Sequence, residues 1–455
     1  MKQGIILIIF FCLSCSSSTD FHGLKNRDIA FVSKHATEAI LTFSHKVEME
    51  STSQPNKADA IEQVNLQVQH LFGPMERSDI SAVPKEDHSI KIISILPKKS
   101  TRGVYEITYT YKGTIVVEKG PRKYLNITLP VNPSTIYQEA MVGDINPCTD
   151  DHYQSEDDFW YFWSPPSIYP DCKLVEGKHY EIIRANIERI KPEAKTTYPE
   201  YHRLANNEII DIHIFFGLDD PSANHDPNKS YDINAENYRR TKDDLLALGF
   251  TIKRWNQKEI SKIAKVSDRI VPYVEEAIKE FPNKSLKIKV RLFFGETGID
   301  ENSKAFHYFL RDSMKNSSIM IYDGHSGLGG HLDIAAIADA RNFRINLNKN
   351  RYQIFFFNSC TSYTYYNTLY FQRKRSTRGR NIIDPKGTKN LDILANGLST
   401  SFDTMHNTDM SLIKAVNAWA QRGTWISYQR LAKEIDSDNL FTVNGDEDNP
   451  RKPVR

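Results

Sequence analysis

Three features that would classify a chain of this length at once are scarce in this sequence: cysteine, net charge and long apolar runs. Only five of the 455 residues are cysteine, which excludes a small scaffold held together mainly by disulfides. Lys and Arg number 59 against 57 Asp and Glu, a net charge of +2, so we expect no nucleic-acid partner. No HExxH or paired CxxC motif is present, so no metal site is predicted.

The residues that are present suit a globular protein with sizeable cores. Hydrophobic residues make up 40% of the chain and aromatic residues 11%, enough apolar surface for two or three domains at usual domain sizes. After the N-terminus, no segment is apolar over the length that a membrane-spanning helix needs. The bulk properties therefore predict a folded, multidomain chain.

The N-terminal residues indicate an export signal rather than part of the fold. A lysine precedes the apolar run GIILIIFFCL, which is too short to span a bilayer, and SCSSSTD follows it. The CLSC segment resembles the bacterial lipobox, in which a small residue, here Ser14, precedes a lipidated cysteine, here Cys15; Cys12 stands where the lipobox usually has leucine. Ser16, in place of Asp, favours the outer membrane. We therefore expect a lipoprotein signal peptide at 1–15 and a lipid anchor in the bacterial cell envelope, with secretion as the alternative.

The remaining cysteines divide into a pair and a single residue. Cys148 and Cys172 lie close together in an exported chain, so we predict a disulfide between them, worth about 3 kcal/mol for a loop of this length,. Cys360 is left alone. An unpaired thiol in an oxidising compartment is either a buried small apolar residue or a residue that the protein uses.

The first part of the chain is predicted to be a β-rich region, residues 20–185. It opens with a polar stretch that has a weak helical pattern at 38–43, and a helix is expected within 58–75 from apolar residues at helical spacing. Between 88 and 130 the period becomes two, with β-branched and aromatic residues between turn residues, which is typical of strands. Residues 186–207 look like a linker.

From residue 208 to residue 435 the pattern alternates between strands and helices. Apolar runs without alternation, interleaved with helices, predict an α/β domain with a mostly parallel sheet covered on both faces. One of the expected helices is the segment VSDRIVPYVEEAIKEF at 266–281. Residues 436–455 are expected to form a polar C-terminal tail. Ligands bind such sheets outside the carboxyl ends of the strands, and both His325 and Cys360 come directly after apolar runs.

The segment YDGHSGLGG around His325 allows three interpretations. It has some likeness to the nucleophile elbow Gly-x-Ser-x-Gly with Ser326 as nucleophile, but Leu328 stands where the second glycine belongs. His325, His331 and Asp333 could bind a metal, although two histidines six residues apart do not share a helix face. The third interpretation pairs His325 with a thiol on another strand.

If His325 pairs with Cys360, one function explains why a polar residue follows each of the two apolar strands. A thiolate is the reactive form of cysteine, and a nearby histidine helps to generate it and later protonates the leaving amine. A glycine-flanked turn lets a peptide backbone approach closely. For either residue alone, an ordinary polar strand end is the better explanation, whereas the pair on successive buried strands favours catalysis.

These motifs resemble those of the clan CD cysteine peptidases, the group of caspases, metacaspases, legumain and clostripain. The Tyr-Asp-Gly-His-Ser run at 322–326 is similar to the metacaspase motif Tyr-Ser-Gly-His-Gly. The Asn-Ser-Cys-Thr-Ser-Tyr run at 358–363 is similar to Asp-Ser-Cys-x-Ser-Gly. The resemblance covers about residues 208–430 and implies a caspase-like fold.

Carried over position by position, the resemblance implies a role for each matching residue. Cys360 is the nucleophile and His325 the general acid and base, and no cofactor is needed. The backbone N–H groups of Ser326 and Cys360 would bind the oxyanion, an interaction worth about 3 kcal/mol in other acyl-transfer enzymes. Ser326 departs from the family, which has glycine directly after the histidine.

The residues expected at the substrate pocket also differ from those of the family. Asn358 replaces the aspartate that binds a basic side chain in metacaspases, so a preference for Arg or Lys does not carry over. Asp219, Asp220 and Asp403 follow expected strand ends and could line the pocket, or be solvated turn residues. The basic segment at 371–380 is interpreted as an exposed loop, open either to self-cleavage or to contact with anionic headgroups.

The sequence thus predicts an exported, lipid-anchored cysteine endopeptidase that acts on a peptide or protein substrate. The alternative is a caspase-like surface lipoprotein without catalytic activity that serves as a binding module, which the replacements at Ser326 and Asn358 would suit. A third hypothesis is a structural envelope protein that uses the β-rich region for partner contacts.

Overall fold

A computed structural model describes residues 31–454 with short gaps. The gaps are residues 72, 74, 76–79, 150–153, 157, 158, 160–162, 164, 166–169, 192–195, 221, 267–270, 300–302, 379, 380 and 438. The predicted signal peptide at 1–15 and the lipidation site Cys15 lie outside the described residues. Among the described residues, no helix combines the length and the hydropathy needed to cross a bilayer.

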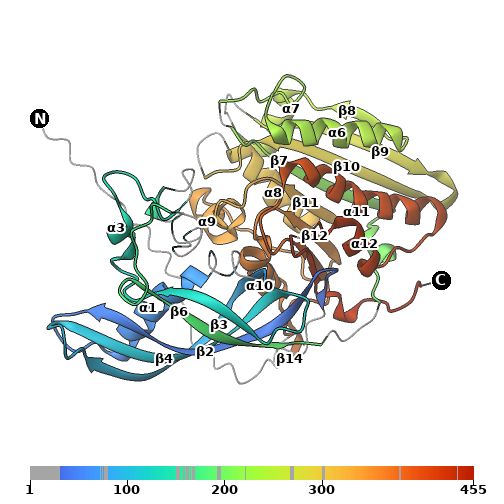
Figure 1. The fold of residues 1–455 in the computed structure, drawn as a ribbon. Coiled ribbons are helices and arrows are strands. Elements are labelled where there is room, and N and C mark those ends of the chain that lie inside the picture. Colours follow the sequence, from blue (N-terminus) through green and yellow to red (C-terminus); the bar gives the residue numbers. More distant parts are fainter. Residues whose placement is uncertain are drawn as a thin grey trace, which may run out of the picture.

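The chain folds into an α/β structure with two separate sheets, a small one and a large one (Figure 1). The small sheet has five strands in the order β3-β4-β2-β6-β5 and is antiparallel throughout. Its strands are β2 (Ala36–Glu50), β3 (Ala82–Pro97), β4 (Val104–Glu118), β5 (Tyr124–Pro130) and β6 (Tyr180–Arg189). Helix α1 (Lys57–Val68), capped by Asn56, packs on one face and closes an apolar core with β2 and β4. We call residues 36–189 the N-terminal domain.

The weak helical pattern predicted at 38–43 was wrong, because these residues lie inside β2. Fifteen successive residues of β2 pair with β4, and this long ladder outweighs a local helical pattern. The predicted disulfide is confirmed: Cys148 and Cys172 are bonded. They belong to a small aromatic core near α3 (Ile136–Ala140) that also contains Phe159 and Trp163.

The large sheet has nine strands in the order β1-β16-β15-β12-β11-β7-β10-β9-β8. Its strands are β1 (Phe31–Val32), β7 (Ile209–Gly217), β8 (Thr251–Arg254), β9 (Tyr273–Phe281), β10 (Leu286–Gly295), β11 (Ile319–Asp323), β12 (Gln353–Asn358), β15 (Leu391–Ala395) and β16 (Thr442–Asn444). The five central strands, from β15 to β10, are parallel, and the two strands at each edge join in antiparallel pairs. The sheet is therefore mixed, and the expectation of a mostly parallel sheet holds for its centre.

Helices cover both faces of the large sheet, as Figure 1 shows. One face packs on α5 (Tyr201–Leu204), α6 (Ile233–Ala247), α11 (Phe402–Arg422) and α12 (Tyr428–Ile435). The other face packs on α7 (Gln257–Ala264), α8 (Lys304–Asn316), α9 (Ile334–Ala340) and α10 (Ser362–Lys374). Successive residues of β12 alternate between the two cores, Ile354 and Phe356 on one side, Phe355 and Phe357 on the other. Because both sides are buried, β11 and β12 at the centre of the sheet are almost entirely apolar.

The edges of the large sheet depart from the sequence expectations. The helix predicted at 266–281 was wrong where it overlaps β9, since nine residues of β9 pair with β10. Its Glu, Ala and Lys content favours helix, but tertiary pairing overrides that preference. The residues expected to form a polar tail at 436–455 include β16, and β6 continues to Arg189, past the expected boundary at 185.

The basic segment at 371–380 is only in part a loop. Its first four residues end α10, and residues 376–378 form β13 (Ser376–Arg378), which pairs with β14 (Asn381–Asp384). Lys374 is fully buried, and its ammonium group donates to the carbonyl oxygens of Asn348 and Arg351 and to the side chain of Gln353. The expectation of an exposed loop is therefore wrong for this lysine.

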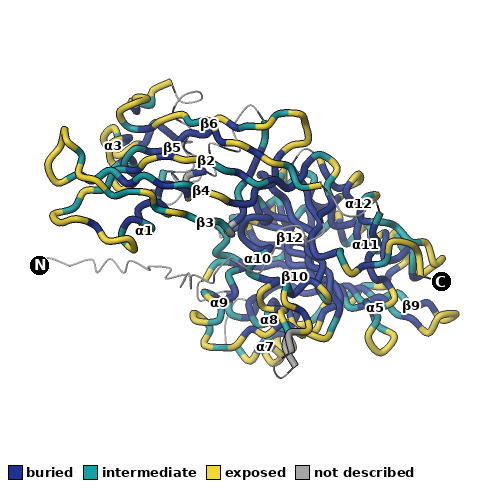
Figure 2. The backbone as a smooth tube through the Cα atoms, turned by 90° about the horizontal axis from the view of Figure 1, so that it is seen from below, coloured by how far each residue is buried: buried dark blue, intermediate teal, exposed yellow. Residues whose placement is uncertain are grey.

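Helix α10 lies between the two sheets and packs against β3 of the N-terminal domain. Figure 2 shows buried backbone running through α10 from one sheet to the other. Ala36, Val83 and Val116 of the N-terminal domain belong to the same apolar core as α10. The two domains thus share an apolar core at α10, the helix that follows Cys360.

Candidate active site

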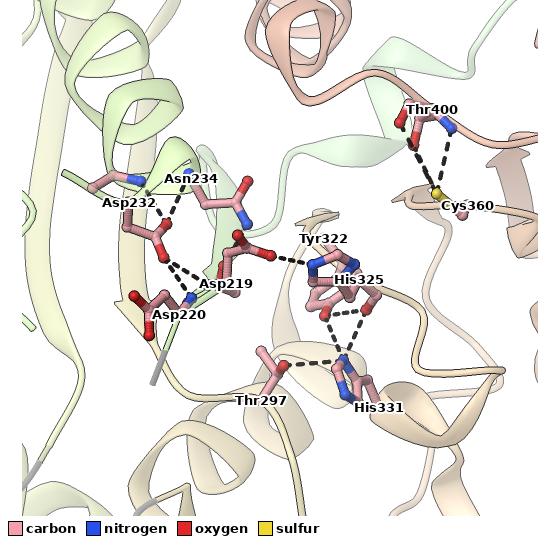
Figure 3. Close-up of polar contacts among 12 residues, drawn as sticks. Asp219, Asp220, Asp232, Asn234, Thr297, Tyr322, His325, His331, Cys360 and Thr400 are labelled. Carbon is pink, nitrogen blue, oxygen red and sulfur yellow. Dashed lines mark hydrogen bonds and ion pairs between the residues drawn. The ribbon is translucent and has the colours of Figure 1, made fainter. Parts of the chain in front are cut away.

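The strands β11 and β12 bring His325 and Cys360 to the same edge of the sheet. These strands are parallel neighbours, and their last residues, Asp323 and Asn358, are partners in the register. His325 and Cys360 each lie two residues beyond these partners. Because neighbouring strands are about 4.8 Å apart, both side chains leave the sheet from one short stretch of its edge (Figure 3).

The turn that carries His325 is held by hydrogen bonds to its backbone. The hydroxyl of Tyr322 and the Nδ1–H of His331 donate to the carbonyl oxygen of His325 over 2.6 and 2.9 Å. Burial lowers the pKa of His331, which keeps this imidazole neutral. Gly324 is required here because a Cβ would lie 3.0 Å from the Tyr322 oxygen and 3.3 Å from the Cα of Gly217.

The imidazole of His325 faces a carboxylate. Its Nε2 contacts Oδ1 of Asp219, which follows β7, the strand beside β11 (Figure 3). Asp219 is itself positioned by Asp232, whose carboxylate accepts the backbone N–H groups of Asp219 and Asp220 over 2.8 and 2.9 Å while it caps α6. With Nε2–H directed to Asp219, Nδ1 is the ring nitrogen left for proton transfer.

Cys360 lies at the start of α10 and is not disulfide-bonded. Its sulfur is partly buried against Thr400, with 3.4 Å to the backbone nitrogen and 3.7 Å to Oγ1. Phe402, two residues further along the chain, packs edge-on against His325 with ring centroids 4.9 Å apart. The segment from β15 to α11 therefore borders both residues. Within the described residues no hydrogen bond joins the sulfur to the imidazole; Figure 3 shows each with its own partner.

The two backbone N–H groups expected to bind an oxyanion are unoccupied. Among the described residues, those of Ser326 and Cys360 have no hydrogen-bond acceptor. The carbonyl oxygen of Ser326 is fixed by the hydroxyl of Tyr366 (3.1 Å) and by the N–H groups of Gly329 and His331. Since Ser326 is only 7% exposed, its side chain is poorly placed to act as a serine nucleophile. The interpretation of this turn as a nucleophile elbow therefore finds no support in the position of the hydroxyl.

Of the residues expected at a substrate pocket, the structure groups only Asp219 with the histidine. Asp219 contacts His325, as described above. Asn358 is 2% exposed, and its amide donates to the Met405 carbonyl oxygen, Thr408 Oγ1 and Asp409 Oδ1 of α11. Asp403 is exposed in the first turn of α11 and forms no ion pair or hydrogen bond with the part of the chain that is described.

A pair of buried carboxyl groups lies beneath the strand ends and was missed by the sequence reasoning. Asp323 ends β11 and Asp409 belongs to α11; both are fully buried. Burial and the neighbouring Asp409 raise the pKa of Asp323 well above its usual range, and burial raises the pKa of Asp409 to about 7. The polar side chains next to the Asp323 carboxyl group are the amide of Asn237 and the carboxyl group of Asp409. Two adjacent buried carboxyl groups of this kind share a proton.

The alternative that His325, His331 and Asp333 bind a metal finds no support. Asp333 caps α9 by accepting the N–H groups of Ala335 and Ala336, and His331 donates to the His325 turn. In the described part of the chain, no three His, Cys, Asp or Glu side chains are placed to bind one ion.

Comparison of the chain with protein-family models, with curated proteins and with solved structures gave no match. The site must therefore be interpreted from its own geometry. Thr400, Phe402, Tyr366 and Asp409 had no motif that pointed to them. Asp219 could have been assigned to His325 only from knowledge that β7 is the neighbour of β11.

Proposed function

We propose that this protein is an exported cysteine endopeptidase with a caspase-like catalytic domain, in which Cys360 and His325 form the catalytic dyad. The observation that carries the proposal is the register of β11 and β12, which places the two residues at equal distances beyond paired strand ends. A substrate bond must meet the thiol and the imidazole together in a suitable geometry, and neighbouring strands in this register support that arrangement.

The reaction follows from the groups at this edge. The Cys360 sulfur, deprotonated with the help of His325, would attack the peptide carbonyl carbon. The resulting oxyanion would accept hydrogen bonds from the N–H groups of Ser326 and Cys360. His325 would then donate its proton to the leaving amine, which leaves an acyl-thioester on the sulfur. Water, deprotonated by His325, would attack the thioester, release the acid and restore the thiol.

Asp219 supports the dyad by orienting the imidazole. Its contact with Nε2 fixes the tautomer with the lone pair on Nδ1 and stabilises the imidazolium form, as the third member of a catalytic triad does. The contact joins the loop after β7 to the turn after β11, so the ring cannot rotate without losing it. The arrangement suits a general base more than an ordinary polar strand end.

The test combines labelling with hydrolysis. A thiol-reactive peptide probe should modify the full chain at Cys360, and a mixed library of fluorogenic peptides should be hydrolysed. Cys360→Ala should abolish both, and His325→Ala should lower hydrolysis at least 100-fold, the usual size of a general acid and base contribution. His202→Ala, at an exposed histidine of α5, is the matched control and should change neither.

The second candidate function is a binding module without peptidase activity. The observation in its favour is that the sulfur contacts Thr400 and the imidazole contacts Asp219, with no direct hydrogen bond between the two. Catalytic hydrogen bonds are often longer before substrate binds, so we rank this second. A chain that hydrolyses no peptide in the library and leaves Cys360 unlabelled would support the module and overturn the peptidase.

A further inference from the structure

We propose that the N-terminal domain positions the nucleophile, and that Glu38 is the positioning residue through which it does so. The inference rests on the proposed function, because it concerns how Cys360 is held. It assigns the N-terminal domain a direct part in the reaction, beyond that of a separate module on the same chain.

The central contact joins strand β2 to the first turn of α10. The hydroxyl of Tyr363, three residues after Cys360, donates to Oε1 of Glu38 over 2.6 Å. Tyr363 is fully buried and Glu38 is 4% exposed. The two residues are 325 positions apart in the sequence. A charge-assisted hydrogen bond in a site closed to water is stronger and more rigid than one at the surface.

Two further contacts from β3 reinforce this one. The ammonium group of Lys85 lies 3.8 Å from the same Glu38 oxygen and 5.5 Å from the centroid of the Tyr363 ring. The hydroxyl of Thr364 donates to the carbonyl oxygen of Pro84 over 2.6 Å. Because Lys85 is also buried, the carboxylate and the ammonium compensate each other's lost hydration. The first turn of α10 is thus held by two strands of the N-terminal domain.

The same turn carries the reacting groups of Cys360. Thr361 connects Cys360 to α10 in the left-handed conformation, with φ of 52°, which an unsupported threonine rarely adopts. The N–H of Thr361 donates to Leu398 and that of Tyr363 to Asn396, so the catalytic domain holds the backbone from one side. Glu38 holds the side chain of Tyr363 from the other side. A shift of this turn would displace both the sulfur and the N–H of Cys360 relative to His325.

The experiment uses the full chain and two variants that remove the contact from opposite sides. Tyr363→Phe removes only the hydroxyl, and Glu38→Ala removes the acceptor. We expect each to lower kcat about tenfold with KM unchanged, because the loss of one well-placed hydrogen bond is of that size. The double variant should be no slower than the slower single variant, since both remove the same contact. Glu38→Gln, which keeps an acceptor oxygen, should recover part of the rate.

The matched control is Glu48→Ala, at the other end of β2. Glu48 also pairs with a lysine of the N-terminal domain, Lys98, but does not reach α10. The Glu48→Ala variant should have a kcat within twofold of that of the parent protein. Folded Tyr363→Phe with parental kcat, or additive losses in the double variant, would overturn the proposal.

A second readout separates this inference from the peptidase proposal. The rate at which iodoacetamide alkylates Cys360 reports the position of the thiol whether or not the chain hydrolyses peptides. We expect Glu38→Ala and Tyr363→Phe to change this rate about tenfold and Glu48→Ala to leave it unchanged. If no peptide is cleaved but the alkylation rates differ in this way, the peptidase proposal fails and the positioning stands. Unchanged alkylation together with unchanged kcat would refute the positioning alone.

Discussion

The turn that carries His325 and the turn that carries Cys360 leave neighbouring strands in matched register, yet they are held by different parts of the molecule. The His325 turn is held by Tyr322, His331 and Asp219, which all belong to the large sheet or its loops. The Cys360 turn is held by the segment around Thr400 and, through Tyr363, by the N-terminal domain. The comparison teaches that the two residues of one candidate site can be held largely by different parts of the molecule, although α10 and the segment from Thr400 to Phe402 contact both turns.

The two turns also differ in their backbone chemistry. The His325 turn contains glycines where a side chain would collide, as at Gly327, whose Cβ would lie 2.4 Å from the ring of His331. The Cys360 turn instead places Thr361 at positive φ, which costs about 1–2 kcal/mol for a residue with a side chain. Such a conformation persists only where the surroundings impose it. Leu328, in the loop after His325, has the same φ of 52°, so both turns depend on their neighbours at one residue.

The largest expected effect tests the support of the His325 turn. Asp219→Asn should lower kcat about 100-fold, because the amide cannot stabilise the imidazolium and favours the wrong tautomer. Alkylation of Cys360 should change less than twofold if the two turns are held independently. Asp220→Asn is the control, since the Asp220 carboxylate accepts hydrogen bonds from Ser222 and Tyr231 and not from His325 in the described part of the chain. Equal losses in both variants would contradict the assignment of Asp219.

A second prediction concerns the carboxyl pair beneath both turns. Burial raises the pKa of Asp409 to about 7, above the ordinary value near 4, so the native state holds a proton that the unfolded chain releases. The free energy of unfolding should therefore fall as pH rises from about 4 to about 7, by at most about 1.4 kcal/mol per pH unit from this group. Asp446, whose pKa is raised the same way, adds to the slope.

Denaturant unfolding at pH 5 and pH 7 checks this prediction. Asp409→Asn should remove its share of the slope, leaving the contributions of Asp323, Asp392 and Asp446, whose pKa values are also raised by burial. Asp403→Asn, at an exposed position of the same helix, should leave the slope unchanged. A slope that is the same in Asp409→Asn and in the parent would show that the pair does not share a proton.

The smallest expected effect tests a hydrogen bond that joins the two turns directly. Tyr366 of α10 donates to the carbonyl oxygen of Ser326, and Tyr366→Phe should cost about 1 kcal/mol of stability. It should also lower kcat several-fold, because it removes a hydrogen bond that holds Ser326, whose N–H is proposed to bind the oxyanion. Tyr370→Phe removes a similar buried bond, to Leu332, and should cost the same stability without the loss of rate. If the two variants have the same kcat, Tyr366 has no part in the candidate site.

Sequence patterns predicted the central strands and helices because the apolar residues of these elements follow the spacing of a buried strand or helix. The apolar runs of β7, β11 and β12 and the amphipathic pattern of α8 were all recognisable. Two strands near the edges of the sheet, β9 and β16, were not. The composition of β9 favours helix, and β16 is too short to show a period. Their conformation comes from pairing with strands already in place.

The candidate site likewise contains residues that could be predicted from the sequence and residues that could not. His325 and Cys360 could be predicted because each directly follows an apolar strand. The roles of Asn358 and Asp409 could not be predicted. The amide of Asn358 donates to Asp409 of α11, a helix that begins more than forty residues later in the chain. Whether Asp403 or Asn358 reaches a substrate depends on which side chains α11 presents to the sheet.

By itself, the sequence determined which residues stand at the ends of the buried strands and which cysteines could pair. The tertiary structure alone decided that Asp219 faces His325, that Thr400 faces Cys360, and that Glu38 reaches the helix after the cysteine. The reason is physical: these contacts join residues from 40 to 325 positions apart. Such contacts depend on strand order and domain packing, which no local pattern of residues encodes.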